Sequence, residues 1–252
     1  MISGLRIRIA TYNVHKCRGL DRRTQPARIA EVIQEIDADV IAIQEVLNVQ
    51  GGKPEFDQAR CIVAKGEYSW RFGETRLLHG GPYGNMTLSR FPVQMSRSYD
   101  LTRHGRERRG CLRTDIRVSE NILLHVFNVH LGTGFMERRH QAQKLVSPHV
   151  LLTNELTGAR VVLGDFNEWT RGLATRLMAT NFESVDLRIL GRYRRTYPGF
   201  LPFLHLDHFY FDKMLRLESC RLHRSRQALV ASDHLPLVAD FSLDEGRDKN
   251  AQ

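Results

Sequence analysis

The sequence predicts one α/β domain in which strands outnumber helices. Two observations lead to this prediction. Short apolar or alternating segments typical of strands recur along the whole chain, and segments with helical spacing lie between them. The chain has 252 residues, 42% of them hydrophobic, which is enough for a sizeable core. No linker, repeat or low-complexity segment interrupts it, so we expect a single domain over residues 1–243 and a charged tail over residues 244–252.

The first elements are two strands with a helix between them. Residues 5–15 alternate apolar and polar side chains, which predicts a strand with one buried face that ends near Asn13 or two residues later. A proline opens the next segment, residues 26–36, in which the apolar residues have helical spacing. Residues 40–46 are almost continuously apolar and contain one acid, which indicates a buried strand with Glu45 at its C-terminal end.

The rest of the chain continues this alternation. Further strands are predicted at residues 69–78, 85–89, 111–118, 122–131, 161–167, 207–211 and 235–241. Helices are predicted at residues 57–65, 136–156 and 172–179, the second kinked or split at Pro148.

Charge and cysteine content narrow the range of partners. The formal net charge of +9 favours a polyanionic partner such as nucleic acid, an acidic membrane surface or a phosphorylated metabolite. The four cysteines are scattered, which fits neither a zinc site nor a disulfide framework. Residues 1–9 do not resemble a signal peptide and no 18-residue apolar stretch exists, so we expect a cytoplasmic protein without a transmembrane segment.

Polar residues able to bind a metal ion or a phosphate recur at the ends of the predicted strands. Taken singly, each is an ordinary hydrogen-bonding group at a loop. Together they indicate a site, because strand ends can converge on one edge of a sandwich of sheets. Buried carboxylates there would repel one another without a cation, and oxygen donors without thiolates favour Mg²⁺ or Mn²⁺. The residues are Asn13, His15, Glu45, Asn128, His130, Asp165, Asn167, Asp207, Asp233 and His234.

Seven segments carry a family resemblance. In chain order they are TYNVH (residues 11–15), IQEV (43–46), GNMTLSRFP (84–92), NVHL (128–131), GDFN (164–167), LDH (206–208) and SDHLP (232–236). This series resembles the motifs of the endonuclease/exonuclease/phosphatase superfamily, in particular its small stand-alone bacterial members. The resemblance covers nearly the whole chain. It implies a DNase I-like, four-layer α/β/β/α sandwich of two mixed β-sheets flanked by helices, and divalent-metal-dependent hydrolysis of a phosphoester.

The resemblance also implies a metal site. Glu45 is similar to the main metal carboxylate of the family, with Asn13 beside it, and Asp233 to a second acidic group near the metal. The implied cofactor is Mg²⁺, with Mn²⁺ as an alternative.

The remaining motif residues are similar to the family's hydrolytic groups. Asp165 matches the residue that orients or deprotonates the attacking water, and Asn167 its phosphate-binding neighbour. His234 matches the histidine that contacts the phosphate, held by a hydrogen bond to Asp207. His130 matches a histidine of the deoxyribonuclease and sphingomyelinase relatives.

Three further residues are candidates for phosphate or substrate binding: Asn85, Arg109 and His15. His15 occupies a position at which apurinic endonucleases carry an acid, and this difference argues against abasic-site repair. Arg109 belongs to a basic stretch with two interpretations, a solvated loop or a phosphate clamp beside the site. That stretch contains Arg103, Arg106, Arg108, Arg109 and Arg113.

The substrate is left open between several phosphoesters. The basic charge favours a nucleic acid cleaved in the manner of an endonuclease; the alternative is a phospholipid, sphingomyelin-like or inositol phosphoester. Another alternative is a non-catalytic binding module of the same fold, but such a module would be expected to lack one of the acids or histidines, and all are present. A DNA-binding protein without chemistry is supported by the charge alone. The sequence predicts no oligomeric state.

Overall fold

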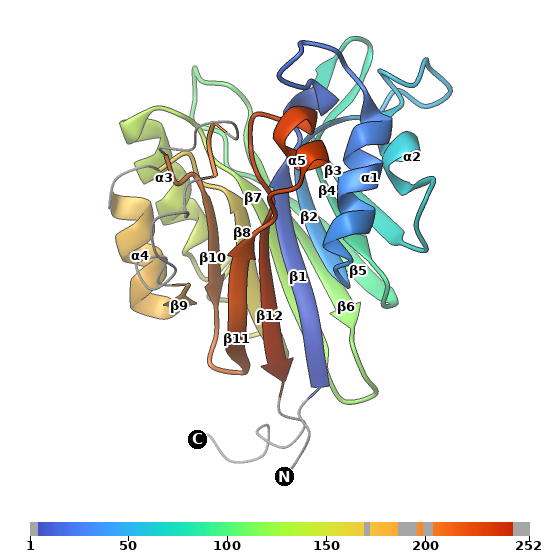
Figure 1. Cartoon of the computed structure of the whole chain (residues 1–252). Coiled ribbons are helices and arrows are strands. Elements are labelled where there is room, and N and C mark those ends of the chain that lie inside the picture. Colours follow the sequence, from blue (N-terminus) through green and yellow to red (C-terminus); the bar gives the residue numbers. More distant parts are fainter. Residues whose placement is uncertain (1–4, 169–171, 186–195, 199–203, 244–252) are drawn as a thin grey trace.

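Two β-sheets of six strands each pack face to face, and helices cover both outer faces (Figure 1). This computed structural model describes residues 5–168, 172–185, 196–198 and 204–243. The four-layer α/β/β/α sandwich of two mixed sheets is therefore confirmed. In the described residues, no helix is long and apolar enough to cross a membrane.

The first sheet has the strand order β11-β12-β1-β2-β4-β3. Its strands are β1 (Leu5–Asn13), β2 (Val40–Leu47), β3 (Ser69–Leu78), β4 (Gly81–Ser89), β11 (Leu215–Leu222) and β12 (Leu237–Leu243). β1 and β2 run parallel with Asn13 beside Gln44, whereas the other pairs are antiparallel. The C-terminal end of β1 is thereby fixed next to Glu45.

The second sheet has the order β5-β6-β7-β8-β10-β9. Its strands are β5 (Val93–Asp100), β6 (Gly110–Arg117), β7 (Leu123–His130), β8 (Ala159–Asp165), β9 (Glu183–Ser184) and β10 (Asp207–Phe211). β7 and β8 are parallel with His130 opposite Asp165, and β10 runs antiparallel to β8 with Asp207 opposite Asp165. This register brings three predicted site residues to one level of the sheet.

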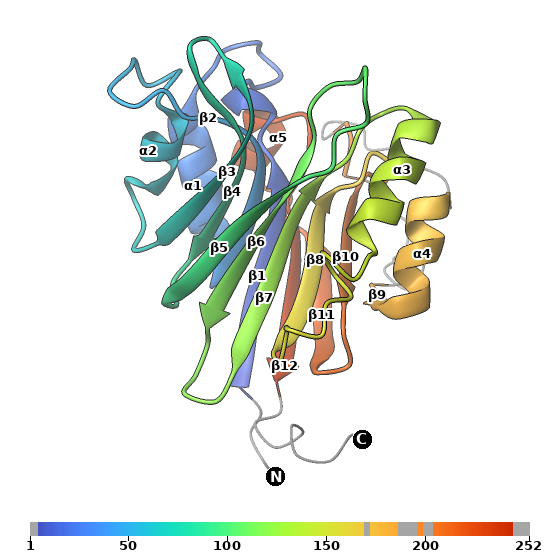
Figure 2. The ribbon, with the colours of Figure 1, turned by 180° about the vertical axis from the view of Figure 1, so that it is seen from behind.

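Within the described residues, five α-helices are divided between the outer faces. Helices α1 (Pro26–Ile36), α2 (Gln58–Val63) and α5 (Arg226–Ala231) lie on the first sheet, and α3 (Phe135–Leu145) and α4 (Leu173–Asn181) lie on the second (Figures 1 and 2). A 3-10 turn, η1 (His15–Cys17), follows β1 directly. Each helix layer packs a separate apolar cluster against its sheet, because the helices bury one face and expose the other.

The space between the sheets is apolar along most of its length and polar near one end. The apolar part includes Ile9, Val126 and Phe241. At the polar end, the Asn128 side chain accepts a hydrogen bond from Gln44 Nε2 at 2.8 Å. It also donates to the carbonyl oxygens of Ile43 and Met86, at 3.1 and 3.0 Å. Asn128 therefore joins the two sheets directly beneath the strand ends that carry Glu45 and His130.

One predicted helix is too long. The periodicity predicts a helix over residues 136–156, but α3 ends at Leu145. Pro148 lacks the backbone N–H that a continuing helix needs, and it disfavours helical backbone at the residue before it. The chain instead turns, with Val150 N donating to the carbonyl of Ser147.

The structure contains several elements that the sequence did not predict. β5 is mostly exposed and polar at the edge of its sheet, so it lacks the apolar alternation typical of a half-buried strand. β11 is likewise an edge strand, and α5 has only six residues. β4 begins at Gly81 rather than residue 85, because its first residues pair with β3. The predicted tail, residues 244–252, lies outside the described residues.

Candidate active site

The strand ends converge at the end of the sandwich opposite Leu5 and Leu243, where β1 begins and β12 ends (Figure 1). β1, β2, β7 and β8 each finish there, β10 begins there, and the loop before β12 passes over them. Six predicted side chains meet at this edge: Asn13, Glu45, His130, Asp165, Asp207 and His234. The structure thus brings together residues as distant in the chain as Asn13 and His234.

Glu45 leaves the regular strand geometry. The β2–β4 register shifts between Ile43 and Val46, and Glu45 has a φ of 63°. Asn13 Nδ2 lies 3.3 Å from Glu45 Oε1 and 2.9 Å from Asp165 Oδ2. Asn13 therefore links the two carboxylates as a shared donor, one from each sheet.

A lysine that the sequence analysis missed also contacts Glu45. Lys16 Nζ lies 2.8 Å from Glu45 Oε2, and His15 Nδ1 lies 3.3 Å from Asp233 Oδ2. Both basic side chains come from η1, directly after Asn13. The available signal was a basic pair following a strand-end asparagine, which is too common in polar loops to be informative.

The second half of the site is a row of two histidines and two acids. His234 Nδ1 lies 2.9 Å from Asp207 Oδ2, and its Nε2 lies 3.8 Å from Asp165 Oδ2. His130 Nε2 lies 3.8 Å from the same Asp165 oxygen and 4.0 Å from Glu45 Oε1. Asp165 is thus the point at which both histidines and Asn13 meet.

The backbone around Asp165 fixes its orientation. Asn167 N donates to Asp165 Oδ1 at 2.8 Å, and Asn167 Nδ2 donates to the carbonyl of Leu131 at 2.9 Å. Gly164 has a φ of 138°, and a Cβ at this position would collide with the Val129 carbonyl of the neighbouring strand. Glycine therefore permits the close β7–β8 approach immediately before Asp165.

The protonation of these groups follows from burial and neighbouring charge. Burial raises the pKa of Asp165 above its ordinary value. Burial alone would lower the pKa of His234, but Asp207 outweighs it and raises the pKa to about 10. Burial lowers the pKa of His130 to about 3. The site accordingly contains one cationic histidine, held by an acid, and one neutral histidine.

Burial also opposes ionisation of Glu45. At the acidic pH at which Glu45 would take up a proton, His130 is itself protonated, and with the Lys16 ammonium it holds the pKa of Glu45 below its ordinary value. Burial together with the Glu45 carboxylate raises the pKa of Tyr83, so the Tyr83 phenol keeps its proton beside an ionised Glu45.

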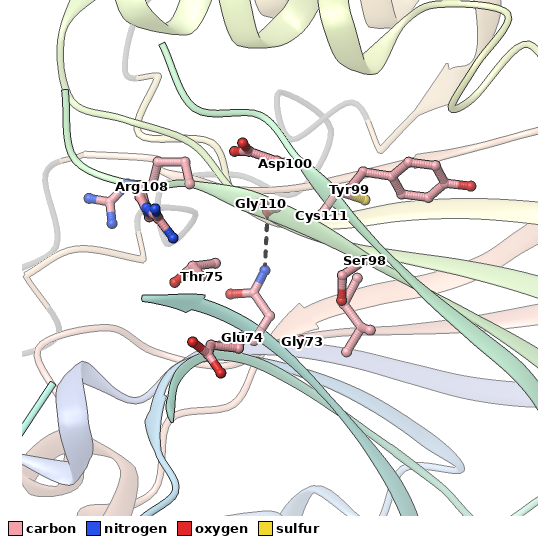
Figure 3. A pocket seen from close by; sticks show the side chains of 12 residues that line it. Gly73, Glu74, Thr75, Ser98, Tyr99, Asp100, Arg108, Gly110 and Cys111 are labelled. Atoms are coloured by element: carbon pink, nitrogen blue, oxygen red, sulfur yellow. Dashed lines mark hydrogen bonds between the residues drawn. The ribbon is translucent and has the colours of Figure 1, made fainter. Parts of the chain in front are cut away.

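Two of the remaining candidates, Asn85 and Arg109, line a cavity of about 210 Å³ between β3, β5 and β6 (Figure 3). Asn85 Nδ2 donates to the carbonyls of Gly110 and Asn128, so this side chain also connects the sheets. Arg109 pairs with Glu107 at 2.8 Å, and Glu107 pairs with Arg76 at the same distance. The guanidinium groups of Arg109 and Arg76 are thus both paired with the Glu107 carboxylate near the cavity.

The basic stretch is divided in the structure. Arg106 and Arg108 are exposed in the loop, as a solvated segment would be. Arg113 lies inside β6, and the interpretation of it as part of a phosphate clamp is wrong. Its guanidinium is buried and makes two hydrogen bonds to Asp115, at 2.7 and 2.6 Å.

Tyr197 is another residue that the sequence analysis missed. Its ring lies 4.9 Å from the His234 ring, centroid to centroid. The apolar residues that follow it in the sequence fall largely on 199–203, outside the described residues. A tyrosine next to a proline in an irregular segment gives no periodic signal that would connect it to His234.

The side chains at this edge differ in how well they could hold a metal ion. In the part of the chain that the structure describes, no three His, Cys, Asp or Glu side chains are placed so that they could hold a metal ion by themselves. Mg²⁺, in contrast, is commonly held by one or two carboxylates, with water and substrate phosphate completing its shell. The Glu45 carboxylate is a hard oxygen donor of the kind that a divalent cation such as Mg²⁺ or Mn²⁺ accepts. The Asn13 Oδ1 beside it accepts a hydrogen bond from His15 N at 3.0 Å, so this amide oxygen would have to exchange that contact to reach a cation.

Comparison with known proteins gives one family. The sequence model of the endonuclease/exonuclease/phosphatase family matches residues 10–234, a range that contains the whole site. The chain is also 28% identical over 248 residues to the uncharacterized protein YbhP of Escherichia coli (strain K12), covering 94% of this chain and 96% of YbhP.

Two solved structures share the fold. An endonuclease/exonuclease/phosphatase from Bacteroides vulgatus has a TM-score of 0.76 at 20% identity, covering 95% of this chain and all of that one. The mannosyl-6-phosphatase Bt3783 of Bacteroides thetaiotaomicron VPI-5482 has a TM-score of 0.73 at 15% identity, covering 94% of this chain and 100% of that chain. At these identities the likeness shows the fold.

Proposed function

The chain belongs to the endonuclease/exonuclease/phosphatase family, and on this premise we propose that it is a divalent-metal-dependent phosphodiesterase. The observation that carries the proposal is the continuous row of groups from Glu45 through Asn13, Asp165 and His234 to Asp207. A carboxylate for a metal stands at one end, and a buried histidine–acid pair stands at the other. This arrangement suits in-line hydrolysis of a phosphoester by water.

Glu45 and Asn13 are the residues that would hold Mg²⁺ or Mn²⁺, with Asp233 as a further acid beside them. When bound, the ion supplies positive charge that stabilises a non-bridging phosphate oxygen. Asp233 is partly exposed and faces His15, so this pair lies at the rim of the site. His15 is accordingly proposed to meet the substrate there.

Asp165 orients the attacking water. Its two oxygens accept hydrogen bonds from Asn13 and Asn167, which leaves the carboxylate little freedom to rotate. A base fixed in this way can aim a water in line with the leaving oxygen. Asn167 is proposed to bind the phosphate in addition to donating a hydrogen bond to Asp165.

The two histidines hold the phosphoryl oxygens. Because His234 donates a hydrogen bond from its Nδ1 to Asp207, its Nε2 faces the same space as Asp165 and is free to donate to phosphate. His130 occupies the corresponding position between Asp165 and Glu45. Of the two, His234 is the one that can protonate the leaving group, because Asp207 raises its pKa whereas burial lowers the pKa of His130.

The substrate proposal rests on charge. A net charge of +9 and arginines at the cavity beside the site favour a nucleic acid. A phospholipid, sphingomyelin-like or inositol phosphoester is the alternative, and the mannosyl-6-phosphatase shares the fold with this chain. Asn85 and Arg109 would then contact the part of the substrate beyond the phosphate.

A substrate panel tests the proposal. Purified protein would be assayed with Mg²⁺ or Mn²⁺, and with EDTA, on bis-p-nitrophenyl phosphate, plasmid and single-stranded DNA, RNA, sphingomyelin, lysophospholipids and inositol phosphates. The Asp165→Asn variant, purified in parallel, controls for contaminating hydrolases. Metal-dependent turnover that the variant lacks supports the proposal. No metal-dependent turnover of any substrate would favour the non-catalytic binding module instead.

A further inference from the structure

Left-handed backbone is concentrated around the Glu45 carboxylate. Eight non-glycine residues of the described chain have a positive φ, and five of them lie at this site. Three are consecutive in η1, with φ values of 46°, 57° and 56°, and Glu45 itself has 63°. Such conformations are unfavourable for residues with a Cβ and persist where the surrounding structure imposes them, often at functional sites. The five are His15, Lys16, Cys17, Glu45 and Asn167.

This unusual backbone places the Lys16 side chain in an ion pair with Glu45. The Lys16 ammonium lies 2.8 Å from Glu45 Oε2, and the lysine side chain is 37% exposed against 16% for the glutamate. The ammonium group therefore stands at the mouth of the site. From there it can reach a substrate, whereas the carboxylate behind it is largely covered.

Gln58 connects the backbone of the turn that carries Lys16 to the backbone of β2 just after Glu45. Its Nε2 donates to the Lys16 carbonyl at 2.7 Å, and its Oε1 accepts from Leu47 N at 3.0 Å, two residues after Glu45. Gln58 is 1% exposed, so its amide is fixed by packing. The neighbouring Cys17 side chain is buried in the core under α1. The turn is thus built to present Lys16 at Glu45.

Stability alone does not account for this construction. A partly exposed ion pair adds little to stability, because water competes for both groups and the lysine chain loses freedom. Three consecutive left-handed residues cost more than such a pair returns. A cation that is expensive to place and open to solvent has the properties of a ligand-binding group.

We propose that Lys16 is a substrate-binding residue, which holds Glu45 in the free protein and contacts a phosphoryl oxygen of the substrate once a divalent cation occupies Glu45. This inference rests on the proposed function. An ammonium group is a compact donor suited to phosphate oxygens. In the free site Lys16 competes with a divalent cation for Glu45, and in the loaded site its charge is available to the anion.

Binding measurements test this role without relying on turnover. Calorimetric titrations would give the affinity of wild-type protein and of Lys16→Met for Mg²⁺, and then for inorganic phosphate at saturating Mg²⁺. Lys65→Met is the matched control, because Lys65 also pairs with a glutamate, Glu31 at 3.3 Å, but on the exposed surface. Lys16→Arg keeps the charge and is expected to restore part of the phosphate affinity.

The expected pattern has two opposite shifts. Lys16→Met should bind Mg²⁺ about twofold to fivefold more tightly, because it removes a competing cation. It should bind phosphate about tenfold more weakly, because it removes a charged donor. Lys65→Met should match wild type in both titrations.

Each contrary result is decisive. Wild-type phosphate affinity in a folded Lys16→Met protein would overturn the role of Lys16 while leaving the proposed function standing. Weaker binding of Mg²⁺ by that variant, with phosphate affinity unchanged, would show that Lys16 merely shapes Glu45. Failure of wild-type protein to bind Mg²⁺ at all would overturn the proposed function and this inference with it.

Discussion

His234 Nδ1 lies 2.9 Å from Asp207 Oδ2, and both side chains are almost completely buried. His234 follows Asp233 in the chain, yet the two neighbours have different partners, since Asp233 lies 3.3 Å from His15. The acid that orients His234 is therefore 27 residues away, at the start of β10, whereas His234 lies in the loop before β12. Adjacent acid and histidine residues need not form a catalytic pair, and here Asp233 and His234 contact different partners.

The first prediction concerns this pair. Asp207→Asn keeps the volume but removes the charge that holds the His234 ring. We expect kcat on the substrate identified by the panel to fall about 10²-fold, as for other groups that orient a catalytic histidine or a metal ligand. KM should change much less, because Asp207 does not face the substrate. Glu218→Gln, at an exposed position, is the control and should retain full activity. An equal loss in kcat for both variants would exclude a specific role for Asp207.

The second prediction concerns the two groups that face the reacting phosphate. Asp165→Asn and His234→Ala should each lower kcat by about 10²–10³, because each removes one preorganised contact to the transition state. Both variants should keep the wild-type circular dichroism spectrum. Their double variant should lose less than the product of the single effects, since the two side chains act as a unit. Near wild-type turnover in folded His234→Ala would remove that residue from the mechanism.

The third prediction tests the polar link between the sheets. Asn128→Leu removes the buried side-chain donor from the carbonyls of Ile43 and Met86, whereas the amide of Gln44 keeps Thr11 Oγ1 and the Ala42 carbonyl as acceptors. Each of these two carbonyls costs about 1–3 kcal/mol when it loses a buried partner, so the free energy of unfolding should fall by at least about 2 kcal/mol. Urea denaturation measures this loss. Asn181→Leu, at the exposed end of α4, should change stability by less than about 0.5 kcal/mol.

The sequence was sufficient to predict which residues lie at the strand ends and that these ends converge. The order of the motifs that contain Asn13, Glu45, Asp165 and His234 indicates the fold. The buried strands have strong apolar patterns. Lys16 and Tyr197 were missed because their places depend on a left-handed turn and an irregular segment, neither of which has a period. Arg113 was misassigned because a basic residue next to a basic loop looks exposed, although the alternation of β6 buries it beside Asp115. Asn128 belongs to a motif, but its link between two sheets is visible only in three dimensions.

The last prediction concerns the buried cluster of Arg113, Asp115 and His125 and its response to pH. Burial alone would raise the pKa of Asp115, but hydrogen bonds from His125 and Arg113 outweigh it and hold the pKa below its ordinary value. A carboxyl whose pKa is lower in the folded than in the unfolded state stabilises the protein above the unfolded pKa of about 3.9. This contribution is lost as the pH falls through the lower, folded value.

Asp115→Asn should therefore cost about 3–5 kcal/mol near neutral pH, because it leaves the buried Arg113 charge without its partner. Urea denaturation of wild type and variant from pH 7 down to pH 3 measures the difference in unfolding free energy. That difference should be constant above about pH 5 and shrink below about pH 4, as wild type loses the carboxylate. Asp21→Asn, which alters an exposed pair with Arg28, is the matched control and should change stability little at any pH. A gap between wild type and Asp115→Asn that stayed constant down to pH 3 would mean that the variant loses packing rather than charge.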